Sequence, residues 1–309
     1  MKSFLLKITV FIFALCTCYG VCLHQKSQGA VDEFYYKCTQ ETNSLILGLS
    51  RANYGISPAV LENELQDYTI TNFAFNANQS PYGDVYLKAI ENKISSSNSK
   101  NGIFIFSVSP RNFTSPKGIS NQKLEALDKK TVLGRIENFT SYPNYSYMMH
   151  CYSGPLYSIF LPNKNSNVIF HNNGWNEFLL QTEQYNISNE QINNWKNLTL
   201  EYYKNEIVKL EISTNRINSL KATIDFLKQK GTVVLVRMPI DANMLELENS
   251  YWQSFDKQML DIANSHKVTY LNYSDNRNKY LTYDGSHLES VSAKKFSTQL
   301  AHDIKERLF

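Results

Sequence analysis

The chain has 309 residues, of which 42% are hydrophobic and 13% aromatic, so it can bury one large core. The 31 basic residues against 28 acidic ones leave a net charge of only +3. Because no basic cluster alternates with aromatic residues, nucleic acid is not expected as a partner. The sequence shows no glycine-rich phosphate loop or cofactor fingerprint, so we expect no cofactor, and the chemistry must come from side chains.

The first 28 residues predict an exported protein. Residues 8–23 carry no charge and follow Lys2 and Lys7, a pattern typical of a signal peptide or of an uncleaved N-terminal membrane anchor. The run is shorter than the ~20 residues of an average spanning helix, which favours a signal peptide, although tilt could accommodate an anchor. Under either interpretation, residues 29–309 form the exported domain, in the periplasm, in the cell envelope or anchored to a membrane.

Beyond this leader, short apolar runs alternate with longer amphipathic stretches, as in a parallel sheet covered by helices. The sequence predicts a single three-layer α/β/α domain, doubly wound around a flavodoxin-like parallel sheet of about five strands. The expected strands are 44–47, 68–73, 102–108, 232–237 and 267–272. The expected helices are 58–66, 82–94, 198–229, 244–263 and 292–307.

Residues from about 130 to 196 break this alternation, because they are dense in Asn, Tyr, Ser and Pro. Their aromatic content predicts an inserted cap over the carboxyl edge of the sheet rather than a disordered linker. Trp175 and Trp195 could stack on sugar rings, or they could pack the insertion against the core, which is the commoner role of a single aromatic residue. His150 and His171 have no carboxylate or Cys at metal-ligand spacing, so we expect them on the surface and expect no metal site.

Two cysteines, Cys38 and Cys151, lie outside the leader. In an oxidising compartment they could pair, but two cysteines do not make a disulfide framework. A disulfide and two separate thiols are therefore both open.

Two motifs at opposite ends of the chain can supply a serine, an acid and a histidine. Residues 45–51 predict an apolar strand that enters a tight glycine-containing turn and presents Ser50 at the carboxyl edge, where open α/β sheets bind ligands. Residues 283–288 place Asp284 and His287 on a turn before the last helix. A serine hydroxyl becomes a good nucleophile when an imidazole takes its proton and a carboxylate fixes the tautomer of that imidazole. The chain contains every part of that arrangement.

The serine turn, the closing Asp-x-x-His and the β/α alternation together resemble the SGNH/GDSL hydrolase superfamily, from about residue 44 to the C-terminus outside the insertion. The chain looks most like the exported, membrane-associated bacterial branch that includes the D-alanyl transfer protein of teichoic acid synthesis and relatives of the polysaccharide O-acetyltransferases. Three segments carry this likeness: Gly48-Leu49-Ser50-Arg51, Ser107-Val108-Ser109-Pro110-Arg111 and Asp284-Gly285-Ser286-His287-Leu288.

The resemblance implies roles and an activity. Ser50 would be the nucleophile, His287 the general base and then acid, and Asp284 the group that orients the imidazole. The implied function is a serine esterase or acyltransferase acting on ester-linked acyl groups, acetyl first among them, of an envelope or extracellular glycan. The expected partners are an acylated carbohydrate or other ester substrate, a membrane acyltransferase, and the membrane itself if the leader is retained. A lipase-type esterase is the weaker variant, because no apolar lid helix is evident.

The predicted oxyanion hole is where the chain departs from the superfamily, whose other two motif blocks normally supply a Gly N–H and an Asn side chain. Here Ala77, after Asn76, stands at the Gly position, and Ser109 stands near the Asn position. Loss of one oxyanion donor costs ~10²–10³ in rate. The alternative is therefore a catalytically weak or inactive SGNH-fold scaffold that binds glycan or assists a membrane acyltransferase.

Three arginines are candidates for substrate binding at the same edge. Arg51 follows Ser50, Arg111 follows the third strand, and Arg237 ends the fourth. A guanidinium group there could bind an anionic group or the acyl oxygen. A structural ion pair is an equally good explanation for Arg51 and Arg237.

Overall fold

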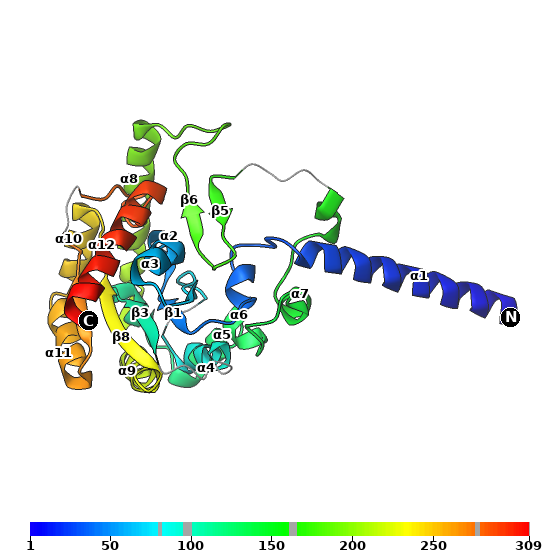
Figure 1. The fold of residues 1–309 in the computed structure, drawn as a ribbon, viewed down its shortest axis with the longest axis horizontal. Helices are drawn as coiled ribbons and strands as arrows, with labels where there is room; N and C mark the ends of the chain where they lie inside the picture. Colours follow the sequence, from blue (N-terminus) through cyan, green and yellow to red (C-terminus); the bar gives the residue numbers. More distant parts are fainter. Residues whose placement is uncertain (80–81, 95–100, 161–165, 276–278, 309) are drawn as a thin grey trace.

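The computed structural model describes residues 1–79, 82–94, 101–160, 166–275 and 279–308. Its centre is a five-stranded sheet with the order β2-β1-β3-β8-β9, in which every neighbouring pair is parallel (Figure 1). This order is the flavodoxin-like one, so the predicted fold class is confirmed. The strands are β1 (Ser44–Leu47), β2 (Ile70–Asn72), β3 (Gly102–Ser107), β8 (Gly231–Arg237) and β9 (Thr269–Asn272).

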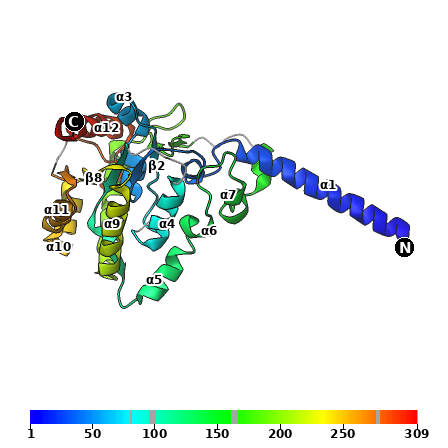
Figure 2. The same cartoon turned by 60° about the horizontal axis from the view of Figure 1, so that its bottom comes forward.

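Helices cover both faces of the sheet, because alternate strand residues enter two separate apolar cores (Figures 1 and 2). Leu45, Phe104 and Leu235 belong to one core, whereas their neighbours Ile46 and Ile105 belong to the other. The first core is closed by α4 (Asp84–Lys93), α9 (Thr214–Leu227) and α11 (Phe255–His266). The second is closed by α2 (Ser50–Gly55), α3 (Pro58–Leu65) and α12 (Ser290–Leu308).

Two of the expected helices are each divided in the structure. In place of one helix over 198–229 there are α8 (Asn189–Ile207) and α9, separated by β7 (Leu210–Ile212), which pairs with β4 (Thr114–Pro116). The hydroxyl of Ser213 accepts a hydrogen bond from the N–H of Arg216 and so begins α9 afresh. In place of 244–263 there are α10 (Ala242–Tyr251) and α11, with Trp252 buried between them. Neither break contains a glycine or proline, the residues that most often mark the end of a helix in a sequence.

The segment from 130 to 196 folds as several small elements. It contains α6 (Val132–Arg135), α7 (Tyr145–His150), η3 (Leu156–Phe160), the hairpin of β5 (Val168–Phe170) with β6 (Asn176–Phe178), and the start of α8. Strand β6 packs beside α2, whereas α6 packs beside α4, so only part of the segment lies near the serine turn. Trp175 is buried, and its indole N–H donates to the carbonyl oxygen of Tyr54 at 2.9 Å, which is the core-packing role.

The remaining short elements complete the chain order. They are η1 (Tyr35–Cys38), η2 (Pro110–Phe113) and α5 (Asn121–Asp128). Cys38 is buried and Cys151 is half-buried, and both are free thiols in this structure. Burial raises the pKa of Cys151 to about 11 and also raises that of Cys38.

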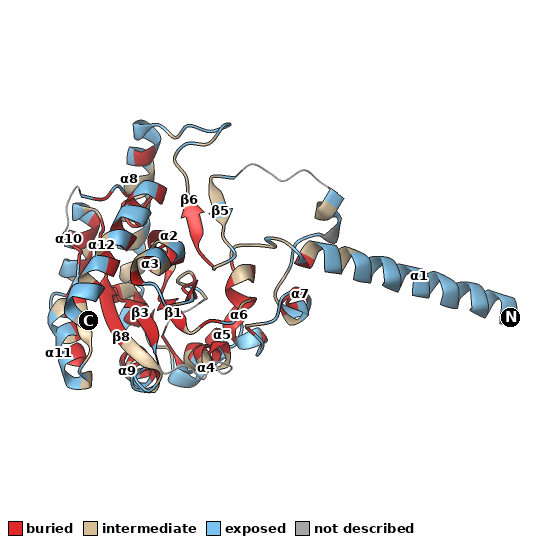
Figure 3. Cartoon of the chain, viewed as in Figure 1, coloured by how far each residue is buried: buried red, intermediate tan, exposed pale blue. Residues whose placement is uncertain are grey.

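Helix α1 (Lys2–Ser27) projects away from the body, and nearly all of it is exposed (Figures 1 and 3). It is long and apolar enough to cross a membrane, a test that a signal sequence also passes. Its last turn contacts the body, because the Tyr35 hydroxyl donates to the Ser27 carbonyl at 2.7 Å and His24 Nδ1 lies 2.6 Å from the Tyr145 hydroxyl.

Two lysines, Lys37 and Lys93, are fully buried. The Lys37 ammonium donates to the carbonyl oxygens of Asn72, at 3.1 Å, and Gly174, which ties the β5–β6 hairpin to the end of β2. The Lys93 ammonium donates to the carbonyl oxygen of Phe139 at 2.8 Å. Burial lowers the pKa of each lysine to about 7.

Candidate active site

Ser50 lies at the carboxyl edge of the sheet because the chain turns sharply after β1. Gly48 has a φ of 131°, and a Cβ at this position would lie 2.9 Å from both Cβ and the carbonyl oxygen of Ser107 on β3. Only glycine fits that approach without strain. Helix α2 begins two residues later, and Ser50 is its first residue, half-buried. The turn therefore forms where the sequence predicts it.

The structure brings Ser50, His287 and Asp284 into one hydrogen-bonded chain. His287 Nε2 lies 2.7 Å from Ser50 Oγ, and His287 Nδ1 lies 2.7 Å from Asp284 Oδ2. The other oxygen of Asp284 accepts the backbone N–H groups of Ser286, at 3.0 Å, and His287, at 2.8 Å. A carboxylate on Nδ1 favours the tautomer whose Nε2 is free to take the serine proton. These distances fit nucleophile activation by a general base.

The environment keeps Asp284 ionised. Burial favours its neutral form, but the charge of His287 and the hydrogen bonds from His287 and Ser286 outweigh it and lower the pKa of Asp284 below the usual value. The carboxylate can therefore stabilise the imidazolium that forms when His287 takes a proton.

Aromatic rings enclose the imidazole, and sequence reasoning did not single them out. Tyr54 meets the His287 ring edge-on at 5.6 Å between centroids, and Tyr283 stacks on it at 5.7 Å. Tyr283 also stacks at 3.9 Å on Phe178 of β6, which in turn contacts Trp195 of α8 at 6.3 Å. Burial raises the pKa of Tyr54 to about 12. Their positions in the sequence could have indicated that they lie near the site, because Tyr54 is one helical turn after Ser50 and Tyr283 directly precedes Asp284.

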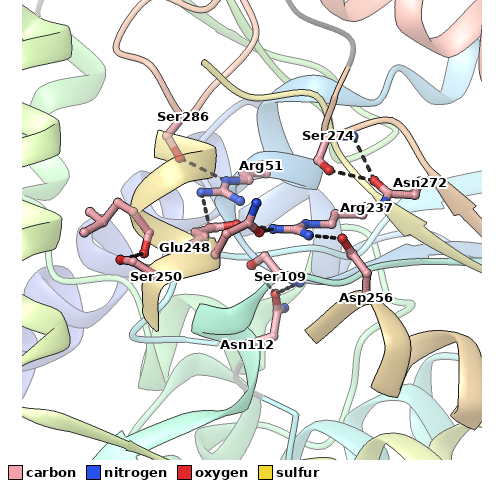
Figure 4. A network of polar contacts seen from close by, with 12 residues as sticks. Arg51, Ser109, Asn112, Arg237, Glu248, Ser250, Asp256, Asn272, Ser274 and Ser286 are labelled. Atoms are coloured by element: carbon pink, nitrogen blue, oxygen red, sulfur yellow. Dashed lines mark hydrogen bonds and ion pairs between the residues drawn. The ribbon is translucent and has the colours of Figure 1, made fainter. Parts of the chain in front are cut away.

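Arg51 and Arg237 are held in a buried polar network (Figure 4). Arg51 Nε donates to Ser286 Oγ at 3.0 Å, and its guanidinium pairs with Glu248 at 2.7 Å. Arg237 pairs with the other oxygen of Glu248 at 3.2 Å and with Asp256. The sequence left substrate binding and a structural ion pair open for each arginine, and in the structure both arginines form ion pairs. Arg51 thereby links the helix that carries the serine to the turn that carries the acid and the histidine.

The residues predicted for the oxyanion hole lie at the same edge of the sheet. The N–H of Phe75 donates to the Gly48 carbonyl at 3.1 Å, so Asn76 and Ala77 follow directly beyond the serine turn. Ala77 lines a cleft of about 370 Å³ together with Arg111. The Arg111 guanidinium also lies 3.6 Å from a Glu206 carboxylate oxygen.

Ser109 is occupied in a local hydrogen-bond pair. Its hydroxyl donates to Asn112 Oδ1 at 2.6 Å, and its backbone N–H donates to the same oxygen at 2.8 Å. Asn112 Nδ2 is buried and has no hydrogen-bond partner among the described residues. In this loop, the amide NH₂ of Asn112 is therefore free to donate a hydrogen bond, whereas the sequence had pointed to Ser109, three residues earlier.

The histidines of the insertion differ in their surroundings. His150 is exposed, as expected. His171 is half-buried, stacks on Trp175 at 4.9 Å and pairs with Glu177 at 2.7 Å, six residues further along the hairpin. Glu177 also pairs with Lys294 of α12 at 2.6 Å, so this cluster fastens the hairpin to the body. Within the described ranges, no group of three or more His, Cys, Asp or Glu side chains is placed to hold a metal ion.

No protein-family model matches the chain, and no curated protein matches its sequence. Among solved structures, the inhibitor-bound aryl esterase of M. smegmatis is 9% identical, with 86% of this chain and 99% of that one covered and a TM-score of 0.41. A carbohydrate acetylesterase from Sinorhizobium meliloti is 10% identical, with the same coverage and a TM-score of 0.38. Similarities this weak transfer no activity to the chain.

Proposed function

We propose that this protein is an SGNH-type serine esterase or O-acyltransferase that removes or transfers an ester-linked acyl group, acetyl in the simplest case, on an envelope or extracellular glycan. The observation that carries the proposal is the continuous chain from Ser50 Oγ through His287 to Asp284, with 2.7 Å at each of its two side-chain contacts. Helix α1 supports an exported site, whether it is a signal sequence or an anchor. An anchor would also bring the site close to a membrane acyltransferase partner.

The mechanism that we propose uses these three side chains. His287 Nε2 takes the Ser50 proton while the serine oxygen attacks the ester carbonyl. The backbone N–H groups of Ser50 and Ala77 are the proposed donors to the oxyanion, because the segment that carries Ala77 is hydrogen-bonded to the serine turn through the Phe75 N–H and the Gly48 carbonyl. The ester C–O bond then breaks, and His287 returns the proton to the departing alcohol oxygen. Water or a sugar hydroxyl resolves the acyl-enzyme by the same steps in reverse.

The second candidate is the non-catalytic scaffold, and two observations favour it. An alanine, Ala77, stands where the superfamily has the glycine of its oxyanion hole, and Ala77 does not have the positive φ that a glycine can adopt. The Ser109 hydroxyl already donates its hydrogen bond to Asn112. A protein that kept the triad but lost the oxyanion donors would fold and bind glycan without hydrolysing the ester.

The test is hydrolysis of 4-nitrophenyl acetate by the full chain in detergent, compared with Ser50→Ala and His287→Ala. Each substitution should lower kcat at least about 10³-fold, because serine and imidazole act as one unit. Ser250→Ala, at an exposed serine of α10, is the matched control and should retain activity. Activity that survives Ser50→Ala would contradict the proposal, and a folded but inactive wild type would favour the scaffold. Adding an excess of a sugar alcohol then separates transfer, which yields the sugar ester, from hydrolysis.

A further inference from the structure

A polar cleft adjoins the turn that carries the proposed acid and base. It consists of two hollows, of about 330 and 260 Å³, that share Lys196, Asp241 and Asn243. Its walls are α8, the beginning of α10 and the loop 280–285. We call it the Lys196 cleft. The first hollow is near the lower end of the roughly 300–1,000 Å³ of ligand pockets and the second lies just below it, which suits one unit of a polymer or a small molecule.

One face of α8 forms a wall of the cleft. Asn193, Lys196, Asn197 and Leu200 all line it. Their spacing of three and four residues puts these side chains on a single helical face. The opposite wall includes Met244, on the first turns of α10.

The charged groups of the cleft are paired with one another. Lys196 Nζ lies 2.8 Å from Asp241 Oδ2, and the Thr282 hydroxyl donates to the other oxygen of Asp241. The cleft therefore carries no net charge from this pair. A phosphate or carboxylate ligand would have to compete with Asp241 for the ammonium group, so the cleft does not favour an anion.

The other polar groups of the cleft suit hydroxyls. The amides of Asn193, Asn197 and Asn243 are exposed to solvent in the cleft. Each amide offers both donors and an acceptor, which is what neighbouring hydroxyl groups require. Leu200, which is half-buried, adds an apolar surface for the C–H face of a ring.

The cleft is in direct contact with the catalytic turn. Gly285, between Asp284 and Ser286, lines it, and the Gly285 carbonyl accepts the N–H of Asp241 at 3.0 Å. A side chain at Gly285 would point into this wall, because its Cβ would lie 3.8 Å from Lys196 Cγ and 3.9 Å from Asp241 Cβ. A ligand in the cleft therefore touches the backbone that holds the acid and the base.

We propose that the Lys196 cleft binds the uncharged, hydroxyl-rich alcohol part of the ester, which is a sugar unit; this inference rests on the proposed function of Ser50. During acylation the bond from Ser50 Oγ to the acyl carbon forms and the ester C–O bond breaks. The serine proton passes through His287 to the alcohol oxygen. The sugar is then released from the cleft, or a second sugar enters it and accepts the acyl group.

The test compares two esters on the full chain in detergent: 6-O-acetylglucose, whose alcohol part is a sugar with free hydroxyls, and 4-nitrophenyl acetate, whose alcohol part is not a sugar. Asn197→Ala and Asn243→Ala should each lower kcat/KM for 6-O-acetylglucose roughly fivefold, mainly through KM, because each removes one or two hydrogen bonds. Turnover of 4-nitrophenyl acetate should change less than twofold. Asn205→Ala, ~12 Å further along α8 and outside the cleft, is the matched control and should change neither. Equal losses on both esters, or no loss on either, would overturn the inference.

A binding measurement separates this inference from the proposed function. Calorimetric titration of cellotetraose into the Ser50→Ala chain needs no turnover. Binding that the Asn197→Ala/Asn243→Ala pair abolishes, with circular dichroism unchanged, would support the cleft even if no ester is hydrolysed. Absent binding, or binding that the pair leaves intact, would overturn it even if the serine proves to be active.

Discussion

Replacement of Asp284 by asparagine tests the role assigned to the acid with little change in shape. In the wild type, one carboxylate oxygen accepts two backbone N–H groups and the other lies 2.7 Å from His287 Nδ1. An asparagine can keep the two backbone bonds through its own oxygen. Its NH₂ then faces Nδ1 and forces that nitrogen to be the acceptor, so the ring proton moves to Nε2. With Nε2 protonated, His287 cannot take the proton of Ser50.

The expected loss in kcat is about 10⁴-fold, the size seen when a serine-protease triad acid is changed in this way. This corresponds to about 5 kcal/mol of transition-state stabilisation. The assay is hydrolysis of 4-nitrophenyl acetate, with urea unfolding to show that the variant is folded. Asp261→Asn, at an exposed position of α11, is the matched control. Activity within tenfold of wild type in the folded variant would refute the assigned role of Asp284.

Three further changes test the framework of the site. Glu248→Gln removes the buried charge between two arginines, so the free energy of unfolding should fall by about 3–5 kcal/mol in urea titrations; a loss below about 1 kcal/mol would contradict the network. Gly48→Ala should cost roughly 1–3 kcal/mol and displace the serine turn, and unchanged stability and activity would show that the turn tolerates a Cβ. The pKa values of Lys37 and Lys93 fall from 10.5 to about 7 on folding, so the unfolded state binds more protons and these lysines should make stability rise between about pH 7 and pH 10.5, by at most about 1.4 kcal/mol per pH unit per lysine. Lys93→Met should reduce that slope in urea titrations at several pH values, and an unchanged slope would contradict a lowered pKa.

The parallel sheet could be predicted from the sequence because its strands are buried on both faces. Such strands are short, continuous apolar runs, and 44–47 coincides with β1 in the structure. The position of Ser50 at the carboxyl edge of the sheet could be predicted because it directly follows a strand and a tight glycine turn. The pairing of Asp284 with His287 is local, since three residues separate them. These features depend on near neighbours in the sequence.

The remaining parts of the site depend on contacts that no local pattern encodes. Arg51 and Glu248 are far apart in the chain, and their ion pair exists only because α10 packs near the serine turn. The sequence offered an ion pair as one alternative for Arg51 but could not name the partner. Phe178 reaches Tyr283 through the fold of the insertion, where polar and aromatic residues follow neither a helical nor a strand period. Asn112 rather than Ser109 has the free hydrogen-bond donor, and this depends on side-chain geometry within one short turn.

Covalent labelling tests whether His287 activates Ser50. The full chain in detergent is treated with a fluorophosphonate probe, and the labelled residue is identified by peptide mass spectrometry. The account predicts a label on Ser50 in the wild type and none in folded Ser50→Ala or His287→Ala. A folded wild-type chain that takes no label, or a label that survives His287→Ala, would contradict it.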